Sequence, residues 1–267
     1  MPRFAANLKF LFQELPLMER FEAAAKAGFA GVEYQFPYGE PVAEMRKRLD
    51  DDGLRMVLIN APAGDWQAGD RGLAALPGRE SDFRASMAEA IEYAGALGCS
   101  RIHVMAGVPG VQVNRETALS VFTENLSYAA KLGIAEGIRV LTEPLNPMDV
   151  PGYLIACAAD ARSIMSAVAS DNLFLQYDLY HGAMNGDDLM ETVRGNLDVI
   201  GHMQVAAAPG RGEPVDGDVD YTSLFEAIDV MGYGGWIGCE YTPAAGTLAG
   251  LGWASVYGIG RPFRPVP

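Results

Sequence analysis

Short apolar runs and amphipathic segments alternate along the whole chain. Eight runs have the length and composition of buried β-strands, and they cover residues 4–8, 31–34, 55–60, 101–105, 139–143, 173–178, 200–205 and 236–240. Between these runs, apolar residues recur at three- and four-residue steps, which is the spacing of one helix face. The clearest case is 83–97, where five apolar residues from Phe83 to Leu97 fall on one side. Similar patterns predict helices over about 113–135, 155–168, 186–198 and 221–231.

The first predicted helix is bounded by residues that suit its two ends. Pro16 fits the start of a helix, because its missing N–H is not needed there. Gly28 fits the end, because glycine readily adopts the left-handed conformation that stops a helix. A strand-like run follows at 31–34, so the alternation of strand and helix begins with the first residues of the chain.

Eight strands separated by helices predict an α/β fold, a single (β/α)8 TIM barrel, whose strands are all parallel because each connection is a helix. A doubly wound open sheet is the alternative. It would need a phosphate loop or another crevice at a strand-order switch. The glycine-containing stretches 72–80 and 206–214 do not have the spacing of such a loop. Since no linker divides the chain, we expect one domain over 1–267, with 241–267 as a C-terminal extension.

Composition and charge exclude several classes of partner. The chain has 267 residues, a length that suits one α/β barrel, and its 49% hydrophobic and 20% charged residues are typical of a globular domain. Its 34 acidic and 20 basic side chains give a formal net charge of −14. Such a surface repels phosphate backbones and anionic membranes, so we expect no nucleic-acid partner and no membrane partner. No apolar run is long enough for a membrane-spanning helix.

The cysteines bear on location. Cys99, Cys157 and Cys239 are odd in number, far apart and in no C-x-x-C pattern, so neither a disulfide framework nor a zinc knuckle is indicated. The N-terminus lacks the pattern of a secretory signal. We therefore expect a reducing, cytoplasmic location. Whether the protein forms a homo-oligomer stays open, and the tail 253–267 could wrap the barrel or a neighbouring subunit.

The last four strands end in polar side chains at intervals of one strand–helix unit. Glu143, Asp178, Gln204 and Glu240 are 35, 26 and 36 residues apart. In a TIM barrel the carboxyl ends of the strands surround one mouth, which is where catalytic residues are found. We therefore expect these four side chains to meet.

Three carboxylates brought together repel one another and raise each other's pKa unless a cation lies between them. Carboxylate and amide oxygens are hard ligands, so the set Glu143, Asp178, Gln204 and Glu240 favours Mg²⁺ or Mn²⁺ over zinc or copper. Two or so coordination positions would remain for substrate oxygens. For any one of these residues the alternative is an acid that caps the following helix.

Seven segments of the chain carry a resemblance: ANLKFLF, RFEAAAKAGFAGVEYQFPY, NAPAGDWQAGDRGLAALPGRE, TEPLNPMDVPGY, QYDLYH, GHMQVA and GCEY. They resemble the bacterial hydroxypyruvate isomerases, members of the xylose-isomerase-like TIM-barrel superfamily, from about residue 3 to about residue 260. The resemblance implies isomerisation of hydroxypyruvate to tartronate semialdehyde through an enediol or enediolate. It also implies a divalent metal at Glu143, Asp178, Gln204 and Glu240, with Glu143 and Glu240 as proton donor and acceptor.

A substrate with a carboxylate calls for a positive side chain in a loop at the barrel mouth, and arginine is best suited to grip it with two hydrogen bonds. Arg71, Arg79 and Arg211 all lie in loops after the third or seventh predicted strand. Each could instead be a surface or bracing residue. His181, three residues beyond Asp178, could orient a metal ligand, bind substrate or simply pack in its loop.

The remaining candidates concern the walls and floor of the site. His202 precedes Gln204 by two residues, so both point to the same side of the strand and His202 is expected one layer deeper in the barrel. His103 is expected to be a core histidine with its hydrogen bonds satisfied. Trp66 and Phe36 could wall the pocket or belong to ordinary packing.

One departure from the family leaves the substrate open. Members of the family usually carry an acid just after the seventh strand, where this chain has Ala207 and Ala208. The alternatives are an isomerase of 2-oxo-tetronate, a ketose epimerase, or a barrel that only binds a sugar or a partner. A three-zinc phosphodiesterase acting on damaged DNA is also in the superfamily, but three histidines and a charge of −14 suit it poorly.

Overall fold

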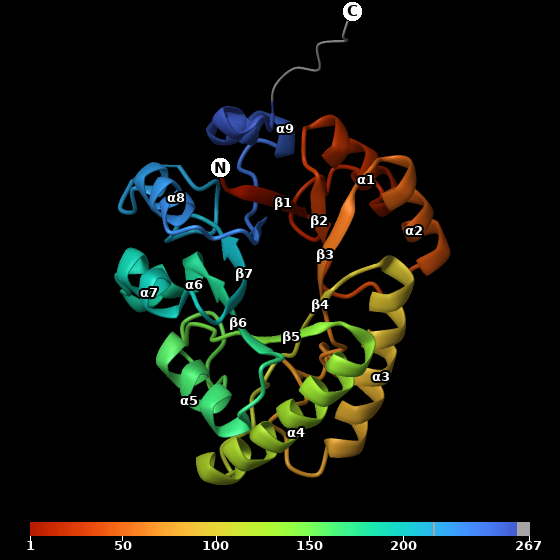
Figure 1. Ribbon diagram of the computed structural model, residues 1–267, viewed down its shortest axis with the longest axis vertical. Helices are drawn as coiled ribbons and strands as arrows, with labels where there is room; N and C mark the ends of the chain where they lie inside the picture. The colour runs from red at the N-terminus through yellow and green to blue at the C-terminus, as the bar shows by residue number, and fades with distance from the viewer. Residues whose placement is uncertain (216, 261–267) are drawn as a thin grey trace, which may run out of the picture.

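The computed structural model describes residues 1–215 and 217–260 as a closed barrel of eight parallel strands in chain order (Figure 1). The strands are β1 (Arg3–Asn7), β2 (Gly31–Glu33), β3 (Arg55–Asn60), β4 (Arg101–His103), β5 (Arg139–Thr142), β6 (Leu173–Asp178), β7 (Ile200–Val205) and β8 (Trp236–Cys239). Parallel pairing of β8 with β1 closes the barrel. All eight predicted strands are present, so the predicted TIM-barrel fold is confirmed.

The helices form a ring around the barrel (Figure 1). They are α1 (Leu17–Lys26), α2 (Val42–Asp51), α3 (Glu80–Leu97), α4 (Arg115–Glu136), α5 (Ala158–Val168), α6 (Leu179–Asn185), α7 (Leu189–Asn196), α8 (Tyr221–Val230), α9 (Thr247–Gly250) and the 3-10 helix η1 (Leu251–Tyr257). Gly28 follows α1 with φ 97°, which confirms that this position needs a left-handed backbone.

The helix predicted over about 186–198 is present as the shorter α7 (Leu189–Asn196), whereas α6 (Leu179–Asn185), which precedes it, was not predicted. Gly186, with φ 79°, ends α6, which begins directly after β6. Asp188 then starts α7, because its side chain accepts a hydrogen bond from the Glu191 backbone N–H. The two short helices together cover the interval between β6 and β7.

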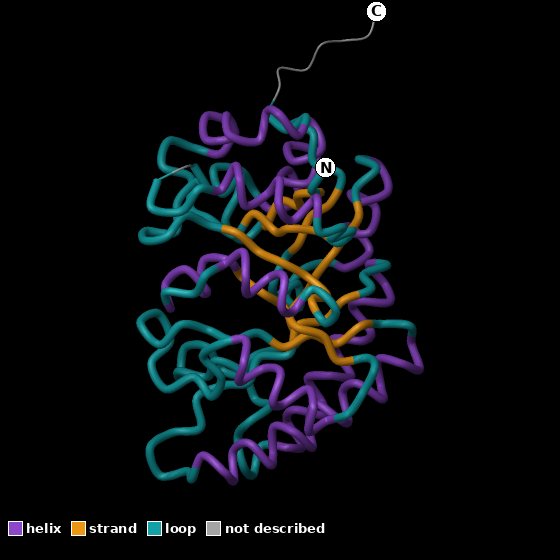
Figure 2. The backbone as a smooth tube through the Cα atoms, turned by 60° about the vertical axis from the view of Figure 1, so that its left-hand side comes forward, coloured by secondary structure: helices purple, strands orange, loops and turns teal. Residues whose placement is uncertain are grey.

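The long loops lie on one side of the strands, as Figure 2 shows, with the strands enclosed by helices. The loop after β3 and the loop after β5 lie at this carboxyl end of the barrel, as do the site residues. The C-terminal extension packs on the barrel, because the Trp253 ring lies 5.0 Å from Phe4 and 5.7 Å from Phe225. Residues 261–267 of the predicted extension and tail lie outside the described residues.

Side chains that point into the barrel form layers, because residues alternate between the two faces of a strand. Toward the carboxyl end the interior is polar and includes Asn7, Asp178 and Gln204, all buried. Beneath that layer lies a small apolar cluster that contains Ala5, Val57, Leu58, Leu141 and Trp236. The candidate site therefore rests on an apolar floor. A much larger apolar core fills the space between the strands and the helices.

Among the described residues, no helix combines the length and the apolar character needed to cross a membrane.

Candidate functional site

The four predicted strand-end residues lie at the same end of the barrel. Glu143 and Glu240 directly follow β5 and β8, Asp178 ends β6, and Gln204 lies in β7. All four are buried, with exposed fractions of 5%, 5%, 1% and 1%. Glu143 and Glu240 reach a cavity of about 510 Å³ at the barrel mouth, while Asp178 and Gln204 lie beneath its lining.

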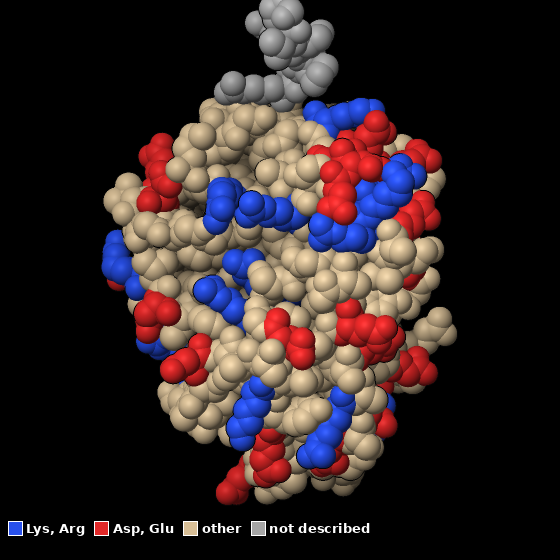
Figure 3. All heavy atoms as spheres, turned by 45° about the vertical axis from the view of Figure 1, so that its right-hand side comes forward, with Lys and Arg blue, Asp and Glu red and all other residues tan. Residues whose placement is uncertain are grey.

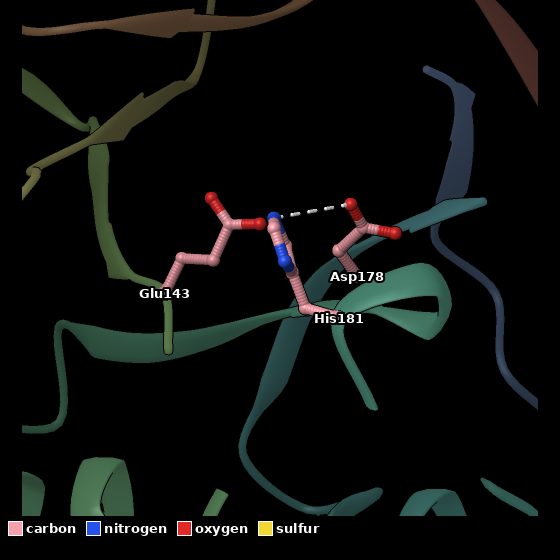
Figure 4. A group of neighbouring side chains, drawn as sticks. All are labelled: Glu143, Asp178 and His181. Atoms are coloured by element: carbon pink, nitrogen blue, oxygen red, sulfur yellow. Dashed lines mark ion pairs between the residues drawn. The ribbon is translucent and has the colours of Figure 1, made fainter. Parts of the chain in front are cut away.

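Glu143, Asp178 and His181 point toward one another (Figure 4). One ligand atom from each lies within 4.8 Å of the others. Asp178 has two roles, because its Oδ1 accepts a hydrogen bond from the Tyr180 backbone N–H at 2.9 Å and so begins α6. Its Oδ2 is buried and has no hydrogen-bond partner among the described residues. This oxygen keeps its lone pairs available for a ligand.

Gln204 joins the carboxylates through its amide nitrogen. Gln204 Nε2 donates to Glu33 Oε1 at 2.7 Å and to Glu240 Oε2 at 2.6 Å. Gln204 Oε1 accepts a hydrogen bond from Gln176 Nε2 at 2.7 Å, and the same Gln176 amide donates to Glu143 Oε2 at 2.9 Å. The Gln204 oxygen, which the sequence predicts as a metal ligand, is thus turned to Gln176 in this arrangement.

Arg211 places a positive charge among the acids. Its guanidinium pairs with Glu240 Oε1 and lies 3.5 Å from Asp178 Oδ2 and 3.6 Å from Asp149 Oδ2. It also lies 4.7 Å from the centre of the Tyr180 ring, a cation–π distance. The loop that presents it is tight, since Ala207 N donates to Gly212 O and Arg211 N donates to Ala207 O, each at 2.9 Å.

Burial and mutual repulsion perturb the acids. Burial, together with the charges of Asp178 and Glu240, raises the pKa of Glu143 well above its ordinary value. Burial raises the pKa of Glu240 to about 8, although Arg211 acts in the opposite direction. Burial also opposes the charge of Arg211, but Glu240 and Asp178 outweigh this and raise its pKa. Glu143 and Glu240 therefore hold protons or pair with a cation at neutral pH.

The donor set fits a divalent cation of the hard type. Glu143, Asp178 and Glu240 offer carboxylate oxygens, and Asp178 Oδ2 is an oxygen that lacks any other hydrogen-bond partner among the described residues. Oxygen ligands of this kind suit Mg²⁺ and Mn²⁺. The cation that the structure itself supplies between Asp178 and Glu240 is Arg211.

His181 is oriented by Asn146. Asn146 Oδ1 accepts hydrogen bonds from the backbone N–H groups of Met148 and Asp149, at 3.1 and 2.9 Å, which identifies its Nδ2 as the atom 2.7 Å from His181 Nδ1. The Asn146 backbone N–H also donates to Nδ1 at 3.3 Å. Since Nδ1 accepts, the proton of the neutral ring is on Nε2, which lies 3.8 Å from Asp178 Oδ2. His181 is therefore arranged as a hydrogen-bond donor rather than as a metal ligand.

The other two histidines differ from each other. His202 Nε2 lies 2.7 Å from Glu33 Oε2, beneath Gln204, in the deeper layer that the sequence predicts. His103 does not have the partners expected of a core histidine, because neither ring nitrogen has a hydrogen bond among the described residues. It reaches the cavity, 3.5 Å from Glu143 Oε2. Burial, with the charges of His202 and His181, lowers its pKa to about 3, so it is neutral.

The three predicted arginines have different surroundings. Arg71 reaches the cavity, stacks 4.0 Å from the centre of the Trp66 ring and has no carboxylate within 4.0 Å among residues 1–215 and 217–260. Arg79 lies outside the cavity lining and pairs with Asp82 and, at 3.5 Å, with Asp70. Of the two proposed wall residues, Trp66 reaches the cavity and Phe36 packs 5.9 Å from it, ring to ring.

Sequence reasoning missed several polar residues of the site, namely Asn7, Lys9, Glu33, Gln35, Asn146 and Gln176. A signal for two of them was available. Glu33 ends the otherwise apolar β2, and Gln176 lies within the largely apolar β6. Gln176 precedes Asp178 by two residues, which puts both on the inner face of β6. Gly238 leaves room for Glu33, because a Cβ there would overlap the Glu33 carboxylate.

Comparisons with known proteins agree with this architecture. The family model described as "Xylose isomerase-like TIM barrel" matches residues 21–255. The chain is 48% identical to a 2-oxo-tetronate isomerase of Cupriavidus necator, covering 98% of this chain and 100% of that protein. It is 43% identical to a hydroxypyruvate isomerase of Escherichia coli, covering 96% and 100%. A solved structure from Brucella melitensis, described as AP endonuclease, family 2, superposes with a TM-score of 0.94 at 42% identity, covering 96% and 99%. The chain therefore belongs to the xylose isomerase-like TIM-barrel family and is a homologue of its hydroxypyruvate and 2-oxo-tetronate isomerases.

Proposed function

We propose that this protein is a metal-dependent isomerase of a small 2-oxo acid that carries a hydroxyl group on the next carbon. Hydroxypyruvate, which would give tartronate semialdehyde, is the first candidate. The observation that carries the proposal is the pair Glu143 and Glu240, two buried carboxyl groups with raised pKa values that reach one cavity from different strands. Paired carboxyl groups of this kind can give and take protons near neutral pH.

The reaction moves two protons and no net atoms. One glutamate removes the proton from the carbon that bears the hydroxyl, and the electron pair forms a carbon–carbon double bond as the carbonyl oxygen gains negative charge. The other glutamate returns a proton to the former carbonyl carbon. The proton of the substrate hydroxyl passes to the oxygen on that carbon, so that the hydroxyl group becomes the new carbonyl group. Gln176 and Gln204 orient the two carboxyl groups by the hydrogen bonds described above.

A divalent ion would be held by Glu143, Asp178 and Glu240, with Gln204 as the further oxygen ligand that the family resemblance implies. When bound, it would supply Lewis-acid polarisation of the two substrate oxygens and offset the charge of the acids. For Gln204 to take part, its amide oxygen has to leave Gln176.

Arg71 is our choice for the substrate carboxylate. Its guanidinium faces the cavity, is held by the backbone oxygens of Trp66 and Asp70 at 3.1 and 2.7 Å, and has no acid partner within 4.0 Å in the described chain. Arg211 is engaged by Glu240 and Asp178, and Arg79 by Asp82. His181 Nε2–H is placed to donate to a substrate oxygen beside Asp178.

A second substrate is supported by a specific observation. The 48% identical relative is named for 2-oxo-tetronate, an acid with one carbon more than hydroxypyruvate, and a cavity of about 510 Å³ can hold either. Ala207, in the stretch where the family usually has an acid, contributes only backbone groups: its N–H and its carbonyl oxygen hold the loop that presents Arg211. A neutral ketose has no carboxylate for the unpaired Arg71 to bind, so Arg71 favours a 2-oxo acid over a ketose. The raised pKa values of Glu143 and Glu240 favour proton transfer over binding alone.

The test is a substrate panel with added Mg²⁺ or Mn²⁺ and with chelator. Hydroxypyruvate, 2-oxo-tetronate and neutral ketoses are each incubated in deuterated water, and kcat/KM and solvent deuterium in the product are measured. The proposal expects metal-dependent turnover of a 2-oxo acid with deuterium on carbon. Turnover of ketoses alone, or of no compound, would overturn it. A cytoplasmic location remains a prediction, and whether the protein forms a homo-oligomer stays open.

A further inference from the structure

Four strands of the barrel begin with arginine. Arg3, Arg55, Arg101 and Arg139 are the first residues of β1, β3, β4 and β5. They therefore lie at the amino ends of the strands, at the opposite end of the barrel from Glu143 and Glu240. Figure 3 looks onto this end, where Lys and Arg side chains follow a hollow near the middle of the face. We call these four residues the basic floor.

The arginines of the basic floor lie close together without acids between them. Arg101 and Arg139 are direct partners in the pairing of β4 with β5, and like charges at such positions destabilise a sheet. No carboxylate lies within 4.0 Å of any of the four among residues 1–215 and 217–260. This is unexpected in a chain with 34 acids and 20 bases.

Other contacts hold the guanidinium groups in place. Arg3 donates to the Gly234 carbonyl and lies 4.9 Å from the centre of the Trp236 ring. Arg101 Nε donates to the Gly201 carbonyl at 3.1 Å. Arg139 stacks over Phe174, 4.9 Å from the ring centre. Apart from the Ser100 hydroxyl at 3.5 Å from Arg101, these contacts leave most of the N–H donors unused.

Two cavities of about 450 and 420 Å³ meet at Arg101. The first also reaches Arg3 and Arg55, and the second reaches Arg139. Arg46 lines the first cavity as well, but it is paired with Asp50. The basic floor thus offers unpaired arginines around a concave surface large enough for a small molecule.

We propose that the basic floor binds a small oxyanion that carries two or more negative charges, of the phosphate type. Arginine suits this ligand, because its planar group presents pairs of N–H donors that match two oxygens of a phosphate or carboxylate. An anion there would replace the repulsion between Arg101 and Arg139 by two attractive contacts. The site is separated from the candidate active site by the apolar cluster that includes Ala5 and Leu141, so it does not depend on the proposed isomerase function.

A purely structural role makes the opposite prediction. If the arginines only brace the barrel, replacing one lowers the melting temperature whether or not an anion is present. If they form a binding site, Arg139→Gln and Arg55→Gln leave the melting temperature unchanged or higher without the anion and remove the rise that the anion causes. Both side chains are exposed and neither donates a side-chain hydrogen bond within the described chain, so both variants should fold.

The experiment titrates the full-length protein with inorganic phosphate by calorimetry and by thermal melts, with malonate as a second arm that tests a dicarboxylate. Sodium chloride at matched ionic strength measures simple screening. We expect a saturable rise in melting temperature with phosphate and an affinity at least about tenfold weaker in Arg139→Gln and Arg55→Gln. A stronger response to malonate than to phosphate would overturn the phosphate assignment.

Two matched variants locate the binding. Arg84→Gln removes an exposed arginine in the second turn of α3, which has no carboxylate within 4.0 Å in the described chain and stacks on Tyr128. Because Arg84 lines neither of the two cavities, this variant should bind phosphate as the wild type does. Arg71→Gln changes the candidate active site and should likewise keep the response. The proposal is wrong if chloride gives the same shift as phosphate, or if only Arg71→Gln weakens binding.

Discussion

At the residue scale, the two glutamates of the site are held by different numbers of donors. Glu240 accepts hydrogen bonds from Asn7, Gln35 and Gln204 on one oxygen and pairs with Arg211 on the other. Glu143 accepts one from Gln176. Glu240 is therefore fixed in direction by its neighbours, and Glu143 has more freedom to follow a substrate.

Replacing either glutamate by glutamine tests proton transfer directly. Glu143→Gln keeps the shape of the side chain and removes its basicity, so kcat should fall by about 10²–10⁴-fold while the melting temperature changes little. Glu240→Gln should lose as much activity. It should also lose some stability, because the new amide N–H group would face side chains that already donate to Glu240. The measurements are turnover of hydroxypyruvate and 2-oxo-tetronate, and deuterium exchange. A Glu143→Gln variant with a tenth of the wild-type rate would contradict the assignment.

Asn146 is a positioning residue for His181. In Asn146→Asp, a carboxylate oxygen replaces the donor that faces Nδ1, so the ring should move its proton to Nδ1 and lose the Nε2–H donor. The backbone bonds to Oδ1 can persist, because aspartate keeps that oxygen. We expect a roughly 10- to 100-fold lower kcat, the range seen when partners that orient a site histidine are lost. Nitrogen chemical shifts of His181 report the tautomer, and an unchanged tautomer with lower activity would contradict the explanation.

Part of this site could be read from the sequence, for a geometric reason. Asp178 ends β6, and Glu143 and Glu240 directly follow β5 and β8. The carboxyl ends of the strands of a barrel converge whatever their distance in sequence. Glu33 could not be placed in the same way, because its contact with His202 spans 169 residues and depends on the order and tilt of the strands. The direction of the Gln204 amide is set by Glu33 and Gln176 together, so it is a property of the folded barrel.

At the scale of elements, the strands were easier to predict than the breaks between helices. Buried strands of a parallel sheet are apolar runs, and the sequence shows eight of them. The helical pattern seen in the sequence began only at 186, so α6 was missed; Gly186, in a left-handed conformation, ends α6, and the Asp188 cap then begins α7. The course of a loop is harder to predict than a strand or a helix. Arg71 and Arg79 both follow β3, but Arg71 reaches the cavity and Arg79 pairs with Asp82 outside it.

These two arginines provide a matched pair for substrate binding. Arg71→Gln should raise KM for a 2-oxo acid by at least about tenfold, because a charge-assisted contact to the substrate carboxylate is lost, and should change kcat less. Arg79→Gln breaks pairs with Asp82 and Asp70 that are partly exposed, so it should change stability by less than about 1 kcal/mol and leave KM unchanged. Steady-state kinetics of both variants check this, and equal changes in KM would remove Arg71 from the substrate site.

At the scale of the whole molecule, the barrel stacks three kinds of interior along one axis. The carboxyl end holds acids with raised pKa values, the middle is apolar, and the amino end carries the basic floor. Opposite charges thus gather at opposite ends of one closed sheet. A bound cation would stabilise the carboxyl end most, and a bound anion would stabilise the amino end most. We therefore expect the melting temperature of the barrel to rise with either ion.

The metal-free protein should become less stable as the pH rises. Burial raises the pKa of Glu240 from an ordinary value of 4.5 to about 8, and that of Glu143 moves in the same direction. Between pH 4.5 and 8 the folded protein holds protons that the unfolded chain has lost, so this stabilisation is complete at low pH and disappears as the pH passes the folded value.

Thermal melts of the chelated protein between pH 5 and 8 measure this effect. Each 1 kcal/mol lost lowers the melting temperature by about 2–4 °C in a protein of roughly this size. Saturating Mn²⁺ or Mg²⁺ should flatten the profile, because a ligand that binds only the folded state stabilises it most where the acids are ionised. Glu240→Gln should have a shallower slope without metal, whereas Glu191→Gln, an exposed residue paired with Arg194, should keep the wild-type slope. A melting temperature that rises with pH in the chelated protein would contradict the raised pKa values on which the proton-transfer roles of Glu143 and Glu240 depend.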